Sequence, residues 1–433
     1  MRIIIYLSAF QNMITTDINS LIFFLFLAIF VTYTLFKNSV SMESSEWTLY
    51  GRKLNFYHVG FLIVGTLVGG ASTIGTTQMA YEYGAPSLIF TFSSAFACLI
   101  LGIFFSYKLR ESESITAIEL IGKRFGEHTR KYLSFFALAG IFLQTVAQMI
   151  AASSIIRANI KVSFEASIVI TSFFIFFFII LFGIKGASFL GQYKFYMLYM
   201  ILAFSLIIIF KNGFYFIQQN LKEYGFARGL KDTISTILGV LSTQTYLQAI
   251  FAAKDVKHAR NGSLLAALII PPVGLGFYLI GLYMKNIKPD IPITSDVLAI
   301  FIQTYIPFGI SSIFLVFIFI ISIGTASGLF LGTLTMLFED HIKIYYKRVS
   351  DNPIFFYRIT GLILIIISSM ITLNVKSSIL EWSFLSMGLR GSSIFLPLII
   401  IIFNLRYGKR TSFFIYTLPI LYVIYTVITK LIA

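Results

Sequence analysis

The sequence predicts an all-α integral membrane protein with about twelve transmembrane helices, and three observations support this class. Hydrophobic residues make up 58% of the 433 residues and charged residues only 12%, a balance that no soluble core of this size requires. The apolar runs have the length of a membrane-spanning helix, roughly 20 residues, rather than the roughly ten of an outer-membrane strand. The third observation is that polar residues interrupt two of these runs, which indicates where a binding site lies.

In chain order, the apolar segments predict twelve spans. The first, Ile18 to Phe36, is too long for a typical signal sequence and no clear cleavage site follows it, so we expect it to be retained. The other spans are expected at 56–83, 87–107, 133–156, 164–183, 190–210, 233–253, 262–284, 309–338, 356–374, 378–403 and 412–432.

The second and seventh spans contain the polar interruptions, at Gly69 to Gln78 and at Gly239 to Gln248. Unwound backbone survives in lipid only where it is buried in protein or binds a ligand, and a helix broken inside the membrane is typical of a transporter site. The alternative is that the small residues form a close helix-packing face. The two segments are five spans apart, which predicts two inverted five-helix repeats.

These repeats divide the chain into three parts. Residues 1–55 form a leading helix and a cytoplasmic loop, and residues 404–433 form a trailing helix. The core occupies 56–403, with repeat 1 at about 56–210 and repeat 2 at about 233–403.

Basic residues predict the orientation. They gather in the loops 108–131, 254–260, 343–348 and 406–410, which lie on one side if the spans alternate, and that side is then cytoplasmic. Four basic residues in 211–232 oppose this assignment without reversing it. The N-terminus is therefore expected outside a bacterial cytoplasmic membrane. Because the +15 net charge lies in these loops, it indicates a membrane protein rather than a nucleic-acid partner.

The reactive residues argue against an enzyme. Cys98 is the single cysteine, and the four histidines are dispersed without metal-ligand spacing, so neither a disulfide framework nor a transition-metal site is expected. No nucleophile stands with a base, and no cofactor is indicated.

Three motifs resemble the sodium:solute symporter family. The first runs from Gly65 to Tyr81 and continues into Tyr83-Gly84, the second from Gln248 to Arg260, and the third from Gly324-Thr-Ala-Ser-Gly328 through to Lys343. Their order and spacing agree over about Leu35 to Phe403. The resemblance implies the LeuT-type fold of five plus five inverted helices. It also implies a secondary transporter that imports a small organic solute with sodium as the coupling ion.

The resemblance further implies a sodium site. Its ligands would be the carbonyls of Ala71, Ile74 and Ile321 and hydroxyls from two adjacent positions, which here are Gly324 and Thr325. One hydroxyl is therefore missing, and either Ser322 or a water substitutes for it, or the sodium site is weakened or lost. The alternative for Thr325 is a hydrogen bond to the carbonyl four residues earlier in its own helix.

Other coupling modes stay open. Many relatives place an aspartate in the span that begins at Leu190, where this chain has Gly191-Gln192. No acidic residue lies well inside any span, so a proton relay has no obvious carrier. The alternatives are a proton-coupled or uncoupled transporter, or a membrane sensor that binds a solute without moving it.

The predicted solute site consists of amides and hydroxyls beside the first interruption. Such groups converging in an apolar pocket suit a polar small molecule, although each could instead bond a neighbouring helix. The candidates are Thr73, Thr77, Gln78, Gln144, Gln148, Gln244 and Gln248.

Arg390 completes the candidate set. It lies deep in the apolar run from Ile379 to Phe403, where an arginine costs at least about 2.5 kcal/mol and so needs a partner. It could bind a solute carboxylate with both arms of its guanidinium, or bond backbone carbonyls as a structural cation.

Overall fold

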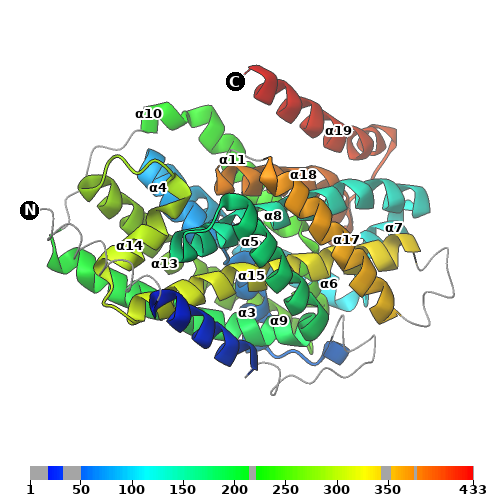
Figure 1. The fold of residues 1–433 in the computed structure, drawn as a ribbon. Helices are drawn as coiled ribbons and strands as arrows, with labels where there is room; N and C mark the ends of the chain where they lie inside the picture. The colour runs from blue at the N-terminus through cyan, green and yellow to red at the C-terminus, as the bar shows by residue number, and fades with distance from the viewer. Residues whose placement is uncertain (1–17, 33–49, 214–220, 343–352, 375–377, 433) are drawn as a thin grey trace, which may run out of the picture.

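The computed structural model describes residues 18–32, 50–213, 221–342, 353–374 and 378–432, although it leaves some side chains in these ranges, such as those of 179–190, undescribed. Within these ranges the chain is almost entirely helical, and Figure 1 shows the helices packed as one bundle. This confirms the predicted all-α class. Two predicted features lie outside the described residues: the loop 33–49, and the basic loop with Lys343, Lys347 and Arg348.

The helices of the first half follow the leading helix Ile18–Thr32. They are η1 (Tyr50–Arg52), α3 (Phe56–Leu67), η2 (Ala71–Gly75), α4 (Thr76–Tyr83), η3 (Ala85–Leu88), α5 (Ile89–Ile100), η4 (Leu101–Phe105), α6 (Ser106–Glu111), α7 (Ala117–Phe125), α8 (Glu127–Ile160) and α9 (Phe164–Lys211).

The second half repeats this mixture of long and short helices. They are α10 (Leu221–Tyr224), α11 (Phe226–Ser242), α12 (Gln244–Phe251), α13 (Val256–Ile287), η5 (Thr294–Asp296), α14 (Val297–Tyr305), α15 (Ile310–Leu337), η6 (Phe338–Ile342), α17 (Pro353–Leu373), α18 (Ile379–Ile402) and α19 (Lys409–Ile432).

Side-chain caps explain where several of these helices begin. Asn55 accepts a hydrogen bond from the His58 amide before α3, and Asp255 accepts one from the His258 amide before α13. Such caps satisfy amides that lack a partner in the first turn. At α7 the N-cap Thr116 accepts a hydrogen bond from the Glu119 amide, and the Glu119 carboxylate accepts one from the Ile115 amide, just before the cap.

The predicted spans correspond to helices, but not all are long. Eight described helices are long and apolar enough to cross a membrane, and the bent pair α3 with η2 and α4 makes a ninth. The remaining three predicted spans correspond to the shorter apolar helices Ile18–Thr32 and Phe164–Phe178 and to the pair α11 and α12. The chain is therefore a multi-pass integral membrane protein, and the described spans leave the count of twelve as a prediction.

The two predicted spans 164–183 and 190–210 fall in the single helical stretch α9. A straight helix of 48 residues would be about 72 Å long. However, Phe164 packs on Arg157, which pairs with Asp296, and Asn212 bonds Tyr283 close to the end of α13. Both ends of α9 therefore lie toward the same end of the bundle, so its path reverses direction, as two successive spans require.

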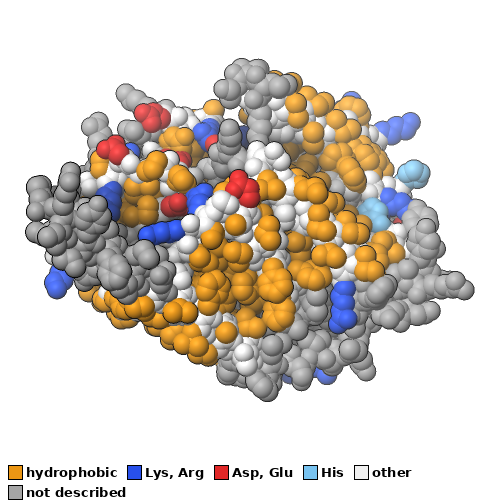
Figure 2. Space-filling view, in the orientation of Figure 1, with side chains coloured by type: hydrophobic (Ala, Val, Ile, Leu, Met, Phe, Trp, Pro, Cys, Tyr) orange, Lys and Arg blue, Asp and Glu red, His pale blue; other side chains and the backbone are white. Residues whose placement is uncertain are grey.

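The bundle has a buried centre and an apolar exterior. Among the described spans α15 is the most buried, and α19 lies on the outside of the bundle next to α18 (Figure 1). Hydrophobic side chains cover much of the face shown in Figure 2. Large apolar residues such as Phe135, Leu268 and Phe413 stay more than half exposed on the long helices, as expected for a surface solvated by lipid.

Candidate functional site: two helix breaks and two buried cations

The first predicted interruption is a true break in the helix. α3 ends at Leu67, Val68 is extended (φ −87°, ψ 101°), and the helix resumes at Ala71 with a 63° change in direction. The break is shorter than the sequence indicated, since Ala71–Gly75 form a π-helical turn rather than unwound backbone. The turn persists because the Thr73 hydroxyl bonds the Gly69 carbonyl at 2.9 Å and its backbone hydrogen bonds remain intact.

Side chains satisfy the amides that the break leaves without helical partners. The Gly69 amide donates to the Ser72 hydroxyl at 2.9 Å, and the Gly70 amide donates to Oε1 of Gln148 on α8 at 2.7 Å. Buried amides must be paired in this way. The glycines permit this close approach, because a Cβ on Gly70 would lie 2.2 Å from Cβ of Ala151. Gln148 therefore supports the break directly.

Carbonyls beside the break converge on Thr325 of α15. The Thr325 hydroxyl oxygen lies 3.1 Å from the Gly65 carbonyl oxygen, 3.2 Å from that of Val68 and 3.0 Å from that of Ile321. The Ile321 carbonyl and the Thr325 hydroxyl thus lie side by side, and the adjacent Gly324 contributes no hydroxyl.

The broken helix presents different carbonyls from those predicted. Gly65 and Val68 face Thr325, whereas the Ala71 carbonyl accepts the Thr76 amide inside the π turn. The carbonyls that face Thr325 thus come from positions earlier in the chain than Ala71 and Ile74, whose role as sodium ligands stays a prediction. The reason is that the freed carbonyls belong to the end of α3, which precedes the break.

Lys194 on α9 is the residue that sequence reasoning missed. Its ammonium nitrogen donates to the Gly65 carbonyl at 2.6 Å and to the Thr325 hydroxyl at 2.8 Å, and the residue is 1% exposed. The sequence held a signal, because Gly191 and Lys194 lie three residues apart on one helix face. A Cβ on Gly191 would lie 2.0 Å from the Phe61 carbonyl, so α9 contacts α3 closely and this face points at the break.

The second predicted interruption is also a break. α11 ends at Ser242, Thr243 is extended (φ −83°, ψ 119°), and α12 begins at Gln244. Arg390 of α18 donates to the Thr243 hydroxyl at 2.7 Å and is fully buried. It also donates to Oε1 of Gln144 on α8 at 3.4 Å and to the carbonyl and hydroxyl oxygens of Ser386. These contacts correspond to the structural alternative for Arg390.

The predicted solute residues do not gather in one place. Gln144 bonds Ser383 and Arg390 near the second break, and Gln148 lies at the first. Gln244 bonds the Ala117 amide and the Ile115 carbonyl at the start of α7, away from the first break. Each pair of amides stays one turn apart on its helix, as the spacing predicted, but Gln144 and Gln148 bond different elements and Gln244 bonds the start of α7.

The other predicted residues lie along the broken helix and at one end of the bundle. The Thr77 hydroxyl donates to the Phe277 carbonyl of α13. Gln78 links α4 to Thr294 of η5 at 3.0 Å and accepts from the Ile379 amide at 3.4 Å. Gln248 is buried on α12, which packs against α3 and α15.

Polar contacts close both ends of the bundle around the breaks. At the end formed by the predicted cytoplasmic loops, Arg130 of α8 pairs with the buried Asp340 of η6 at 2.9 Å. At the opposite end, Arg157 of α8 pairs with Asp296 of η5 at 2.5 Å. Burial raises the pKa of Asp296, and the hydrogen bond from Arg157 opposes that change. α8 therefore provides the arginine of the ion pair at each end, and these two ion pairs are called latches below.

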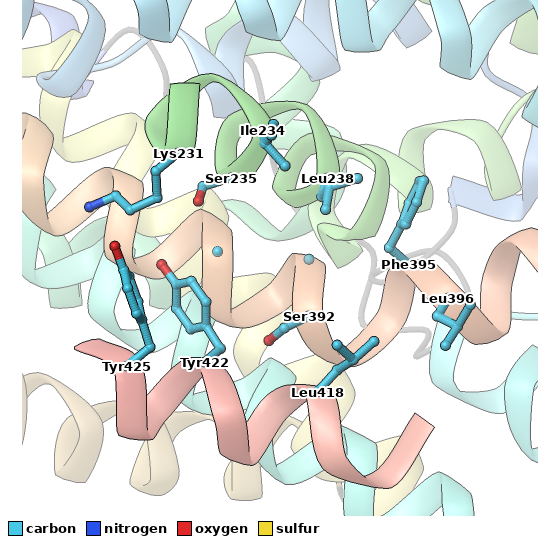
Figure 3. A pocket seen from close by; sticks show the side chains of 12 residues that line it. Lys231, Ile234, Ser235, Leu238, Ser392, Phe395, Leu396, Leu418, Tyr422 and Tyr425 are labelled. Carbon is cyan, nitrogen blue, oxygen red and sulfur yellow. The ribbon is translucent and has the colours of Figure 1, made fainter. Parts of the chain in front are cut away.

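A separate apolar groove of about 400 Å³ lies between α11, α18 and α19 (Figure 3). Tyr422 and Tyr425 of α19 and Phe395 of α18 line it, with Ile234 and Leu238 of α11 on the opposite wall. Its wall contains few polar atoms, so the groove does not form part of the sites at the two breaks.

Two helices broken inside a multi-pass bundle, five predicted spans apart, are the arrangement of a LeuT-type membrane transporter. The family model of the sodium:solute symporter family matches residues 47–414. The chain therefore belongs to the sodium:solute symporter family, as the three motifs predicted.

Comparisons with individual proteins agree with this family and fold. The human sodium-coupled monocarboxylate transporter 2 is 22% identical over 352 residues, which cover 73% of this chain and 56% of that protein. The chain thus matches little more than half of that relative's length.

Among solved structures, a sodium-coupled sialic acid symporter in a substrate-bound outward-open state has a TM-score of 0.71 and 16% identity, with 89% of this chain and 87% of that chain covered. A nucleobase-cation-symport-1 transporter has a TM-score of 0.55 and 12% identity, covering 84% and 81%. A manganese transporter from Eremococcus coleocola has a TM-score of 0.54 and 11% identity, covering 89% and 88%.

Proposed function

We propose that the chain is a secondary transporter that imports a small organic solute by alternating access, driven by a sodium gradient. The observation that carries this proposal is the pair of helix breaks at Val68 and Thr243, which lie in a core with an ion pair of α8 at each end. Broken helices of this kind place backbone groups at a solute or ion site inside the membrane. The family match supports sodium rather than another driving ion.

We propose that the solute binds beside the first break, between α4, α8 and α12. Thr73 of η2, which directly precedes α4, is buried together with Gln148 of α8 and Gln248 of α12, and these residues carry the hydrogen-bonding groups. Gln148 already bonds Gly70, so a bound solute would share or replace that contact. Arg390 belongs at the second break and is not required for solute contact in this proposal.

Small organic acids are the first solutes to test. One relative carries monocarboxylates by name and another carries sialic acid, and both kinds of solute bear a carboxylate.

We further propose that the core 56–403 performs the transport and that its two repeats move relative to each other. In this proposal the chain lies in a bacterial cytoplasmic membrane, with the basic loops inside and the N-terminus outside.

Uptake into proteoliposomes tests the function. A panel of labelled small carboxylates, each beside its neutral amide, is offered with an inward sodium gradient, with an inward proton gradient, or with neither. Accumulation that requires sodium supports symport, whereas accumulation with protons alone or without a gradient indicates the alternative couplings. Binding without accumulation under any gradient would identify a sensor and contradict transport.

A further inference from the structure

The sodium site implied by the family does not fit the residues around Thr325. A sodium ion there would bind the carbonyls of Gly65 and Val68 and the Thr325 hydroxyl, but the ammonium of Lys194 already donates to two of these oxygens. An ion bound to the same two oxygens would lie next to a like charge in a buried site, where the repulsion is strong. The two cations therefore exclude one another.

We propose that the ammonium of Lys194 replaces sodium at this site, so that the chain carries its own cation there. Any sodium that drives transport would bind elsewhere. The inference rests on geometry at the break and does not depend on the proposed solute or driving ion.

The missing hydroxyl at Gly324 agrees with this substitution. A sodium ion needs several oxygen ligands, whereas an ammonium has three N–H donors and needs only as many acceptors. Gly65 and Thr325 supply two, at 2.6 and 2.8 Å. The lysine is thus held by one carbonyl and one hydroxyl, without the second hydroxyl that the family's sodium site would use at position 324.

The end of α3 favours a cation at this point. Its last carbonyls face Lys194 and Thr325, and the carboxyl end of a helix carries a partial negative charge. Both described partners of the ammonium are uncharged oxygens. The helix end thus supplies stabilisation that a carboxylate supplies in other buried ion pairs.

The second break provides independent support. Lys194 lies on the last helix of the first predicted repeat and contacts the break in α3 and a residue of α15. Arg390 lies on the last helix of the second repeat and contacts the break at Thr243 and Gln144 of α8. Because α15 and α8 hold equivalent places in the two repeats, each break is filled by a cationic side chain in the same arrangement.

Equilibrium binding of ²²Na⁺ to the purified protein tests the assignment. The variants are Thr325→Ala, Lys194→Met and the double variant. The matched controls are Thr333→Ala, whose hydroxyl bonds the Leu329 carbonyl of its own helix, and Lys257→Met, which removes an exposed charge.

We expect Thr325→Ala to leave sodium binding of the wild type unchanged. Lys194→Met should gain a sodium site, or tighten binding at least about tenfold, and Thr325→Ala in that background should remove the gain. A tenfold weaker sodium affinity in Thr325→Ala alone would overturn the proposal, and this comparison needs no lysine variant to fold. A folded Lys194→Met protein without any gain would also overturn it. Absence of solute uptake would contradict the proposed function and leave this assignment intact.

Discussion

At the scale of single residues, the two buried cations show that the position of a residue within a predicted span does not determine how deeply it is buried. The sequence singled out Arg390 because it stands in the middle of an apolar run, and passed over Lys194 because it stands four residues inside a span predicted to begin at Leu190. In the structure α9 is helical through that boundary, so Lys194 is as buried as Arg390. The Gly191 and Lys194 spacing marked one face of the helix, but which neighbour covers that face depends on contacts with α3 and α15 that the spacing does not give.

Arg390 is expected to stabilise the fold rather than to select a solute. Arg390→Gln removes the guanidinium that donates to the Thr243 hydroxyl and the Ser386 carbonyl, and hydrogen bonds from a charged group typically contribute about 1.5–3 kcal/mol each. Arg390→Lys should recover part of this stability, because the ammonium retains the charge but not the planar fork. Thermal unfolding of the purified protein measures both effects.

Solute binding separates this role from recognition. If Arg390 is structural, a carboxylate solute and its neutral amide lose affinity equally in Arg390→Gln. A selective loss for the carboxylate would instead show that Arg390 contacts the solute, which is the other interpretation that the sequence left open.

At the scale of elements, the sequence predicted that both helices break but not the residue at which each break occurs. Glycines and hydroxyl residues in an apolar run indicated a break in both spans, and extended residues occur at Val68 and Thr243. Composition could not show which carbonyls face Thr325, because it marks the region of a break but not the residue at which α3 stops. That residue depends on contacts with α8 and α15, which are distant in sequence.

Close packing at the first break predicts a rescue experiment. Gly70→Ala would bring a Cβ to 2.2 Å from Cβ of Ala151, and overpacking of this kind typically costs about 1–3 kcal/mol. Ala151→Gly removes the clashing atom, so the double variant should regain much of the lost thermal stability. Gly408→Ala is the control, because no atom lies within 4 Å of its added Cβ. Equal stability of Gly70→Ala and the wild type would contradict the described approach of η2 to α8.

At the scale of the whole molecule, α8 connects the two latches. Its Arg130 pairs with Asp340 and its Arg157 with Asp296, near opposite ends of one 34-residue helix. Alternating access requires that the ends open in turn. The sequence predicted the helices that carry these residues, but their partners come from segments more than 100 residues away and could not be paired in advance.

Breaking one latch should open one end. Asp340→Asn removes the fully buried negative charge that pairs with Arg130. Loss of one partner of a buried pair typically costs about 3–5 kcal/mol. Hydrogen exchange should therefore become faster in α7 and η6, with little change in η5. Arg157→Gln should show the reverse pattern, with a smaller effect because that pair is less buried. Exchange that rises at both ends in either variant would mean general unfolding rather than opening of one end.

The central claim is that a lysine ammonium occupies the cation position at the first break. The most direct measurement is an electron cryo-microscopy map of the wild-type protein in sodium-containing buffer, at a resolution that shows ordered ions. We predict side-chain density of Lys194 that reaches the Gly65 carbonyl and the Thr325 hydroxyl, with no separate ion between them. A discrete ion peak coordinated by Gly65, Val68 and Thr325, with Lys194 turned away, would contradict the account.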